Sequence, residues 1–150
     1  SLIAESLEIK KNMIEVDEFD EGPRNIFNYG HSFGHAIEGY TKYSIPHGIA
    51  VSYGMDIANS VSVQLGLLDD EIRLRISKTL RKVRRQTQFP DIDIDVYLNY
   101  LKKDKKNLST GIRLILTKGF GDMFLTNVDA DDSFSSKVAE CFKNFKQENV

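Results

Sequence analysis

The 150-residue sequence is poor in several residue types, and each shortage excludes a class of protein. It has a single cysteine, Cys141, so no disulfide can form within the chain and nothing indicates an oxidising compartment. No apolar run approaches the roughly 20 residues that span a bilayer. The formal net charge of −2 gives no basic excess to attract nucleic acid or an anionic membrane. We therefore expect one globular, cytoplasmic domain that binds neither nucleic acid nor membrane.

The stretch from Arg24 to Glu38 predicts a helix with a polar face. Five polar side chains recur there at steps of four, three, four and three residues: Arg24, Asn28, His31, His35 and Glu38. The apolar residues of the stretch (Ile26, Gly30, Phe33, Ile37 and Tyr40) fall on the opposite side. An ordinary solvated face would carry flexible lysine and glutamate, so we interpret this one as chemically active. Histidines on a solvated face remain the alternative.

Histidine is scarce, and all three histidines lie between positions 31 and 47. This concentration predicts a metal site or a proton-transfer site. A catalytic zinc typically takes three protein ligands and leaves one position open. Spacing alone favours His31 and His35, one helical turn apart, as a ligand pair. His47 follows Pro46 at the entrance to the next expected helix, and the intervening loop is long enough to turn it back toward His31.

The rest of the sequence predicts a mainly α fold with one small β-hairpin. The elements are a first helix over 2–16, a buried helix over 48–65, a helix that begins after Asp69 or Asp70, a short helix over about 94–101, strands at 112–117 and 123–125, and a closing helix over about 132–147. The helix after Asp70 should bury the stripe Ile72, Ile76, Leu80 and Val83. Its basic residues, Arg84 among them, should form a solvated or partner-facing surface, because no aromatic residues are interleaved with them.

Several motifs together resemble the metal-binding region of the 3-dehydroquinate synthase family of sugar-phosphate cyclases. The segments that carry the resemblance run in order along nearly the whole chain: Glu8-Ile9-Lys10, Asp17-Glu18, Gly22-Pro23-Arg24, Gly30-His-Ser-Phe-Gly-His-Ala-Ile-Glu38, Pro46-His47-Gly48, Gly54-Met55 and Asp104-Lys105-Lys106. The resemblance implies the helical C-terminal domain of the dehydroquinate synthase-like fold over residues 1–150. It also implies a separate N-terminal NAD-binding domain. Because the chain starts at Ser1 and has no Gly-rich phosphate turn, we expect it to be a fragment without that domain.

The resemblance assigns the histidines differently from the spacing. It makes His31 and His47 the metal ligands, with a glutamate from upstream of this chain as the third ligand, and it places His35 against the substrate phosphate. Glu5 and Glu38 are weaker local candidates for the third ligand. The metal would be a divalent ion, zinc or cobalt. A fragment that lacks the upstream glutamate should bind metal weakly and be inactive.

The resemblance also implies a reaction and a set of substrate contacts. A homodimeric lyase would use NAD to oxidise a ring hydroxyl of a seven-carbon sugar phosphate transiently, eliminate phosphate, reduce the carbonyl again and close a carbocycle. Lys10 and Arg24 would bind a carboxylate and hydroxyls. Asn28, His35 and one of Lys105 and Lys106 would bind the phosphate. From the residues alone, Lys10 is equally well explained as a lysine whose ammonium reaches water along its stem.

Two other functions remain open from the sequence. A metal-dependent alcohol or glycerol dehydrogenase has the same helical half but needs no phosphate-binding residues. A non-catalytic helical interaction module would merely retain these residues. One departure from the family supports the second alternative: Ile49 stands where a glutamate commonly follows the His-Gly pair, so the polar surroundings of His47 differ.

Overall fold

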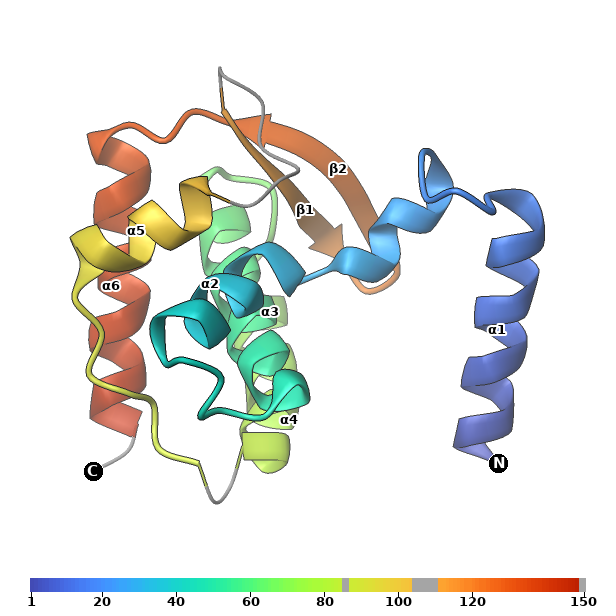
Figure 1. Ribbon diagram of the computed structural model, residues 1–150, viewed down its shortest axis with the longest axis horizontal. Helices are drawn as coiled ribbons and strands as arrows, with labels where there is room; N and C mark the ends of the chain where they lie inside the picture. The colour runs from blue at the N-terminus through green and yellow to red at the C-terminus, as the bar shows by residue number, and fades with distance from the viewer. Residues whose placement is uncertain (85–86, 104–110, 149–150) are drawn as a thin grey trace.

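The computed structural model describes residues 1–84, 87–103 and 111–148, and it has the expected mainly α fold with one β-hairpin (Figure 1). The elements are α1 (Leu2–Val16), the 3-10 helix η1 (Pro23–Asn28), α2 (His31–Tyr40), α3 (His47–Gln64), α4 (Asp70–Arg84), α5 (Ile94–Lys102), β1 (Ile112–Gly119), β2 (Asp122–Val128) and α6 (Asp132–Glu148). None of the helices in the described part of the chain is long and apolar enough to cross a membrane.

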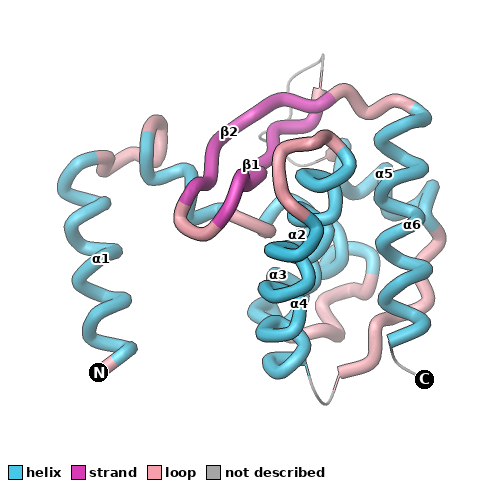
Figure 2. Tube along the Cα trace, turned by 180° about the vertical axis from the view of Figure 1, so that it is seen from behind, coloured by secondary structure: helices cyan, strands magenta, loops and turns pink. Residues whose placement is uncertain are grey.

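Helix α3 is the centre of the molecule, as its apolar residues predict. Ala50, Ile57, Ala58 and Val61 have no exposed surface. Helices α2, α4 and α6 and strand β1 all pack against α3 (Figures 1 and 2). Burial of these aliphatic side chains contributes hydrophobic stabilisation, at about 25 cal/mol per Å² of apolar surface. The surrounding elements therefore hold α3 in a fixed position relative to α2.

The predicted hairpin is confirmed. Strands β1 and β2 are antiparallel, with Ile112 opposite Val128 and Leu116 opposite Phe124. Buried and exposed residues do not alternate regularly along β1, because both faces of the strand are covered near its middle. Residues 114–117 are all buried. The backbone N–H of Thr117 donates to the Ser62 hydroxyl at 3.2 Å, which ties β1 to α3. The hairpin thus closes one end of the helical core.

Helix α1 lies outside this core. It has the predicted bounds, but none of its residues is buried. Its apolar side chains are largely exposed, including Leu2 at 82% and Leu7 at 62%. Figures 1 and 2 show from opposite sides that α1 stands apart from the other helices and joins them through η1. Within the described part of the chain, α1 contacts chiefly η1, and Lys10 is exposed.

The continuous helix expected over residues 24–38 is wrong. The segment forms the 3-10 helix η1, a break at Tyr29 and Gly30, and then α2. Gly30 has a φ of 77°, a left-handed conformation that glycine adopts without the Cβ penalty. A Cβ there would lie 2.7 Å from the Met55 backbone nitrogen, so the close approach of α3 also requires glycine. The break changes the helix axis between Asn28 and His31.

The expected burial of α4 is also partly wrong. Val83, the last residue of the expected stripe, is 57% exposed, whereas Arg84, assigned to the basic surface, is only 5% exposed. The Arg84 guanidinium pairs with Asp56 of α3 and lies over the Tyr53 ring at 4.4 Å. The structure tolerates a buried Arg84 because Asp56 neutralises its charge.

Candidate functional site

The crossing of α2 and α3 brings the candidate site together. Gly30 and Gly34 face the α3 backbone at Val51 and Met55, and a Cβ on Gly34 would be 2.9 Å from the Val51 Cα. Small residues at a crossing let two helix backbones approach closely, which is why larger side chains are absent at these positions. This contact fixes where His31 and His35 lie relative to the start of α3, where His47 is the first residue.

The three imidazoles form a compact triangle. The ring centroids of His31 and His47 are 5.4 Å apart, those of His31 and His35 are 5.5 Å apart, and those of His35 and His47 are 5.7 Å apart. His31 is half-buried, whereas His35 and His47 are exposed. Rings at these separations can direct nitrogen atoms at one small ligand or ion. The loop over 41–46 therefore does return His47 to the other two histidines.

The hydrogen-bond partners distinguish His31 and His47 from His35. His31 Nδ1 lies 3.3 Å from the backbone carbonyl oxygen of Tyr29, and His47 Nδ1 lies 3.2 Å from each carboxylate oxygen of Glu38. A carbonyl or carboxylate oxygen only accepts, so Nδ1 must donate, and in the neutral form of each ring Nε2 then carries the lone pair. Within the described residues the His35 ring has no such oxygen partner. His31 and His47 thus share the tautomer that suits a metal ligand.

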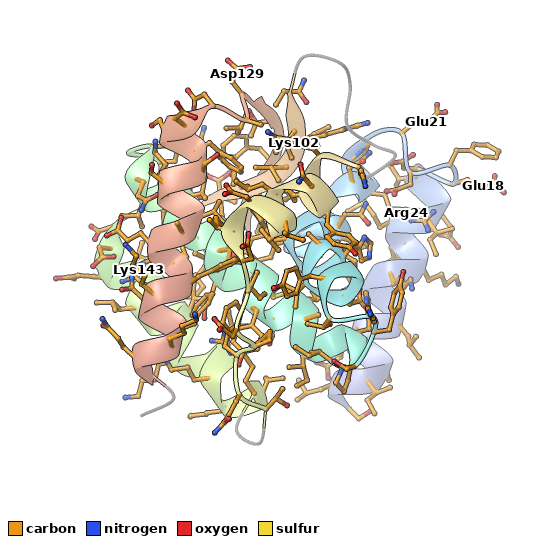
Figure 3. The ribbon with its side chains drawn as sticks, turned by 60° about the vertical axis from the view of Figure 1, so that its left-hand side comes forward. Glu18, Glu21, Arg24, Lys102, Asp129 and Lys143 are labelled. Carbon is orange, nitrogen blue, oxygen red and sulfur yellow. The ribbon has the colours of Figure 1, made fainter. Side chains whose placement is uncertain are left out.

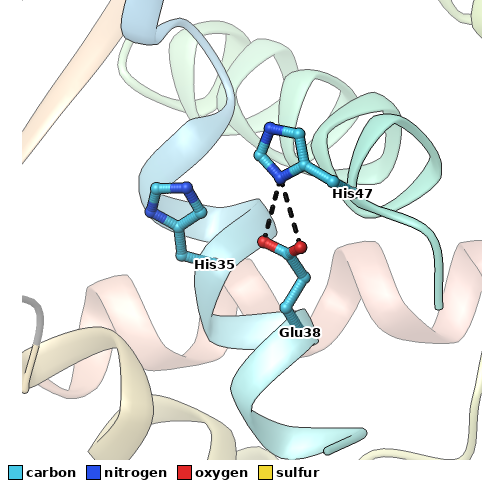
Figure 4. Close-up of side chains that lie close together, drawn as sticks. All are labelled: His35, Glu38 and His47. Atoms are coloured by element: carbon cyan, nitrogen blue, oxygen red, sulfur yellow. Dashed lines mark hydrogen bonds and ion pairs between the residues drawn. The ribbon is translucent and has the colours of Figure 1, made fainter. Parts of the chain in front are cut away.

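Glu38 lies deeper than the histidines around it. Its side chain is 11% exposed, whereas that of His47 is 56% exposed. Figure 4 shows the carboxylate between α2 and the start of α3, with both oxygens directed at His47. One ligand atom each from His35, Glu38 and His47 also fit within 4.8 Å of one another, so this trio is a possible ion-binding group in its own right. Glu38 is therefore either a direct ligand or a partner of His47.

Arg24 and Asn28 lie nearby in sequence but have local partners. The Arg24 guanidinium Nη1 donates to the carbonyl oxygen of Glu18 at 2.7 Å, and Figure 3 shows Arg24 at the junction of α1 and η1 beside Glu18. Asn28 Nδ2 donates to Asp20 Oδ2 at 3.0 Å. Both side chains are half-buried. These contacts brace the turn before η1, so neither side chain extends freely from the predicted polar face.

Asp17 organises the same turn. Burial raises the pKa of its carboxyl, but hydrogen bonds from the backbone N–H groups of Gly22, Glu21 and Arg24 outweigh that effect and lower the pKa. Two of those bonds are 2.9 Å and 3.0 Å long. An ionised Asp17 therefore holds the backbone of Arg24 in place and links α1 to the site.

The structure does not bring every predicted residue to the histidines. Lys10 is exposed on α1, the helix that stands apart, and has no hydrogen-bond partner within the described residues. Glu5, a candidate third ligand, is also on α1, where its carboxylate lies 3.7 Å from the Ser1 amino group. Lys105 and Lys106 lie outside the described residues. The geometry thus gathers the three histidines and Glu38 and leaves the α1 residues away from them.

Comparison with known proteins identifies the family. A family model described as 3-dehydroquinate synthase C-terminal matches residues 1–107. The chain belongs to the 3-dehydroquinate synthase C-terminal family. Curated relatives called 3-dehydroquinate synthase include those of Campylobacter curvus, 38% identical over 97% of this chain and 41% of the relative, and Sulfurovum sp., 37% identical over 94% and 40%. The chain therefore spans about two fifths of the length of these curated relatives.

Solved structures of sugar-phosphate cyclases share the fold. A 2-deoxy-scyllo-inosose synthase complexed with carbaglucose-6-phosphate, NAD+ and Co2+ superposes with a TM-score of 0.70 at 25% identity, over 84% of this chain and 36% of that one. A 2-epi-5-epi-valiolone synthase from Streptomyces hygroscopicus, with NAD+ and Zn2+ bound, has a TM-score of 0.71 at 18% identity, over 92% of this chain and 38% of that one. The latter likeness is one of fold alone.

The donor set of this 3-dehydroquinate synthase C-terminal domain fits a divalent metal better than a dinucleotide. Imidazole nitrogen suits borderline ions such as zinc and cobalt, and two of the rings have the required tautomer. A dinucleotide site needs a Gly-rich turn between a strand and a helix. In the described part of the chain β2 is followed by α6, but their connection over 129–131 has no glycine. The described elements therefore do not provide the strand, Gly-rich turn and helix, in that order, that a dinucleotide site requires.

Sequence reasoning about this 3-dehydroquinate synthase C-terminal domain missed the role of Tyr29 and the pairing of Glu38 with His47. The carbonyl of Tyr29 accepts from His31, and the Tyr29 hydroxyl donates to Asn59 of α3. Burial raises the pKa of Tyr29, so this hydroxyl stays protonated as a donor. A backbone acceptor leaves no sequence signal. Glu38 was visible in the polar stripe, but its partner His47 lies across a loop, and the periodicity of one helix does not reveal such a pair.

Proposed function

We propose that the chain is the metal- and substrate-binding half of a 3-dehydroquinate synthase-like enzyme that cyclises a seven-carbon sugar phosphate with elimination of phosphate. One observation carries the proposal: His31 and His47, on two successive helices, present their rings 5.4 Å from each other with Nδ1 of each held by an oxygen. Family membership supports the reaction class. The named ligands of the related inosose synthase, a sugar phosphate analogue, NAD+ and Co2+, support the cofactors.

In this proposal His31 and His47 hold a divalent zinc or cobalt ion through Nε2. When bound, the ion polarises the hydroxyl and carbonyl oxygens of the substrate. A carboxylate from the part of the enzyme outside this chain completes the ligands, since the chain spans only about two fifths of its curated relatives. That part would also bind NAD, which would supply reversible hydride transfer. The chain's own contribution is to fix two imidazoles and the anionic substrate beside them.

His35 is assigned to the substrate phosphate. Its ring is exposed, lies within 5.7 Å of both other rings and has no oxygen partner within the described residues. A protonated imidazole there donates a charge-assisted hydrogen bond to a phosphate oxygen and can supply a proton as phosphate leaves. This use of His35 favours the cyclase over a dehydrogenase, which has no phosphate to bind.

Arg24 is assigned to a substrate carboxylate. The guanidinium has five N–H donors, and the contacts at the turn use only Nη1. The turn therefore positions Arg24 while donors remain for a bidentate contact. Asn28, Lys10 and one of Lys105 and Lys106 complete the proposed substrate contacts. For Lys10 this requires that α1 lie against the substrate in the complete enzyme.

The test uses the protein encoded by the complete gene, with Co2+, NAD and a seven-carbon sugar phosphate that carries a carboxylate. We expect release of inorganic phosphate, lost by at least 100-fold in His31→Ala and His47→Ala because each removes a metal ligand. Lys143→Ala, an exposed change on α6, is the matched control and should keep full activity (Figure 3). Unchanged activity in both histidine variants would overturn the proposal, as would NAD-dependent alcohol oxidation with no phosphate release.

A further inference from the structure

Glu38 is the most deeply placed ionisable group of the site. Its side chain is 11% exposed, and a carboxylate so placed is unfavourable unless a donor satisfies it. Both oxygens lie 3.2 Å from His47 Nδ1. Within the described residues this imidazole is the only side chain that hydrogen-bonds to the Glu38 carboxylate. The reaction outlined above gives the carboxylate no task.

The backbone around Glu38 fixes where its carboxylate points. The Tyr43 N–H donates to the Glu38 carbonyl at 2.8 Å, and Lys42 and Tyr43 both have positive φ, so the chain turns tightly after α2. The Thr41 hydroxyl donates to the Ile37 carbonyl at 2.8 Å. Ile37, the neighbour of Glu38, has no exposed surface and anchors α2 in the core. The carboxylate is therefore held against the first turn of α3, while His47 itself is largely exposed.

We infer that Glu38 is a positioning residue that fixes His47 with its proton on Nδ1 and its Nε2 lone pair free for the metal. The inference rests on the metal site of the proposed function. An ionised carboxylate accepts a hydrogen bond from Nδ1–H, sets the ring orientation and increases the electron density at Nε2, as carboxylate partners of metal-bound histidines do. The Ile49 side chain, two residues after His47, is half-buried against the apolar core and cannot accept a hydrogen bond. Glu38 is thus the carboxylate that holds His47 in this chain.

The His31 contact shows the same arrangement with a different acceptor. Its Nδ1 lies 3.3 Å from a backbone carbonyl, which a side-chain substitution cannot remove. His47, at the start of a helix and 56% exposed, has no such backbone partner within the described residues. An exposed imidazole without an acceptor would interconvert between tautomers and rotate. Removal of Glu38 should therefore free His47 and leave His31 unchanged.

The first experiment needs no metal. Nitrogen-15 NMR of the 150-residue chain reports which imidazole nitrogen carries the proton, and we expect Nδ1–H at both His31 and His47. Glu38→Ala should convert His47 to a mixture of tautomers. Glu38→Gln keeps an amide oxygen as acceptor and should preserve Nδ1–H. Glu140→Ala, which removes an exposed α6 carboxylate that accepts from Gln64, is the matched control for loss of charge.

The second experiment measures Co2+ affinity in the protein encoded by the complete gene. We expect Glu38→Ala to weaken binding about 10-fold to 100-fold. Glu38→Gln should weaken Co2+ binding by less than about 10-fold, because the amide loses the negative charge but keeps an oxygen that accepts from His47 Nδ1. If Glu38 is instead a direct ligand, Glu38→Gln should be as weak as Glu38→Ala, and the inference is wrong. The inference is also wrong if the His47 tautomer is unchanged in Glu38→Ala while the thermal midpoint shows that this variant is folded.

The two proposals fail in different ways. If His47→Ala leaves Co2+ affinity unchanged, the metal site of the proposed function is wrong, whatever the tautomer of His47. If His47→Ala weakens Co2+ binding but Glu38→Ala does not, the metal site stands and the role of Glu38 falls. Glu38→Gln separates a positioning role of Glu38 from a merely structural one. Loss of packing alone would not change which nitrogen of the His47 ring carries the proton.

Discussion

Gly54 provides the sharpest test of how this fold positions its histidines. It lies in α3, where it faces the break between η1 and α2. A Cβ at position 54 would be 2.0 Å from the Gly30 carbonyl oxygen and 2.8 Å from the Gly34 backbone nitrogen. Ordinary contacts of a Cβ begin at 3.4 Å. In Gly54→Ala the two helices must therefore separate by about 1 Å or more, because backbone atoms cannot rotate away as a side chain does.

Two opposing effects set the magnitude. Alanine is better than glycine inside a helix by about 1 kcal/mol. Overpacking costs about 1–3 kcal/mol, and a clash with backbone on both sides belongs at or above the upper end of that range. We expect Gly54→Ala to lower the free energy of unfolding by about 2 kcal/mol, which for a chain of this size lowers the melting temperature by about 4–8 °C.

Gly48 is the matched control on the same helix. No atom lies within 4 Å of the position that its Cβ would occupy. Gly48→Ala should raise the free energy of unfolding by about 0.4–1 kcal/mol, because alanine reduces the conformational freedom of the unfolded chain. Urea denaturation followed by circular dichroism gives both values. If Gly54→Ala is as stable as Gly48→Ala, the close approach of α2 and α3 is not a constraint, and our account of the site geometry is wrong.

Three other predictions concern charge and burial away from the histidines. Arg84→Ala should lower the free energy of unfolding by about 3–5 kcal/mol in urea, because it leaves Asp56 buried without its cation, whereas the double change to Met at 84 and Leu at 56 should recover most of that loss. Since the pKa of Asp17 is lowered on folding, its contribution to stability is present above about pH 4 and is lost as pH falls through the folded pKa. Asp17→Asn should therefore flatten the acid limb of a thermal stability profile, and an unchanged limb would contradict the role given to Asp17. Burial raises the pKa of Cys141 to about 11, so a thiol reagent at pH 8 should label it only at the rate of unfolding, and rapid labelling of the folded chain would contradict this.

Much of the fold follows from local sequence signals. The hairpin was predictable because Lys118, Gly119 and Gly121 mark a turn between two apolar runs, and the turn forms between β1 and β2. The last helix was predictable because Phe134, Val138 and Phe145 recur on one side, and all three are buried. Such signals can be read from residues that are close together in the sequence.

The errors have a tertiary origin. The polar residues recur with a helical period on both sides of Gly30, because a 3-10 helix and an α-helix have similar periods. The break between η1 and α2 depends instead on the α3 backbone, which occupies the space that a Cβ on Gly30 would need. Arg84 sits within a basic run, and its burial depends on Asp56, 28 residues earlier. The approach of His47 to His31 could be anticipated, but the acceptors at Nδ1 could not, because one is a backbone carbonyl and the other lies across a loop.

The short connection between α2 and α3 has a consequence for folding kinetics. All three imidazoles and Glu38 come from residues 31–47, and only residues 41–46 separate the two helices. Closing so small a loop costs little chain entropy, and local contacts generally form quickly. The contact of Ser32 with the Arg113 carbonyl, 81 residues away, belongs to a slower class. The histidine cluster should therefore assemble before the hairpin packs against α2, so the proposed metal ligands would come together before the core is complete.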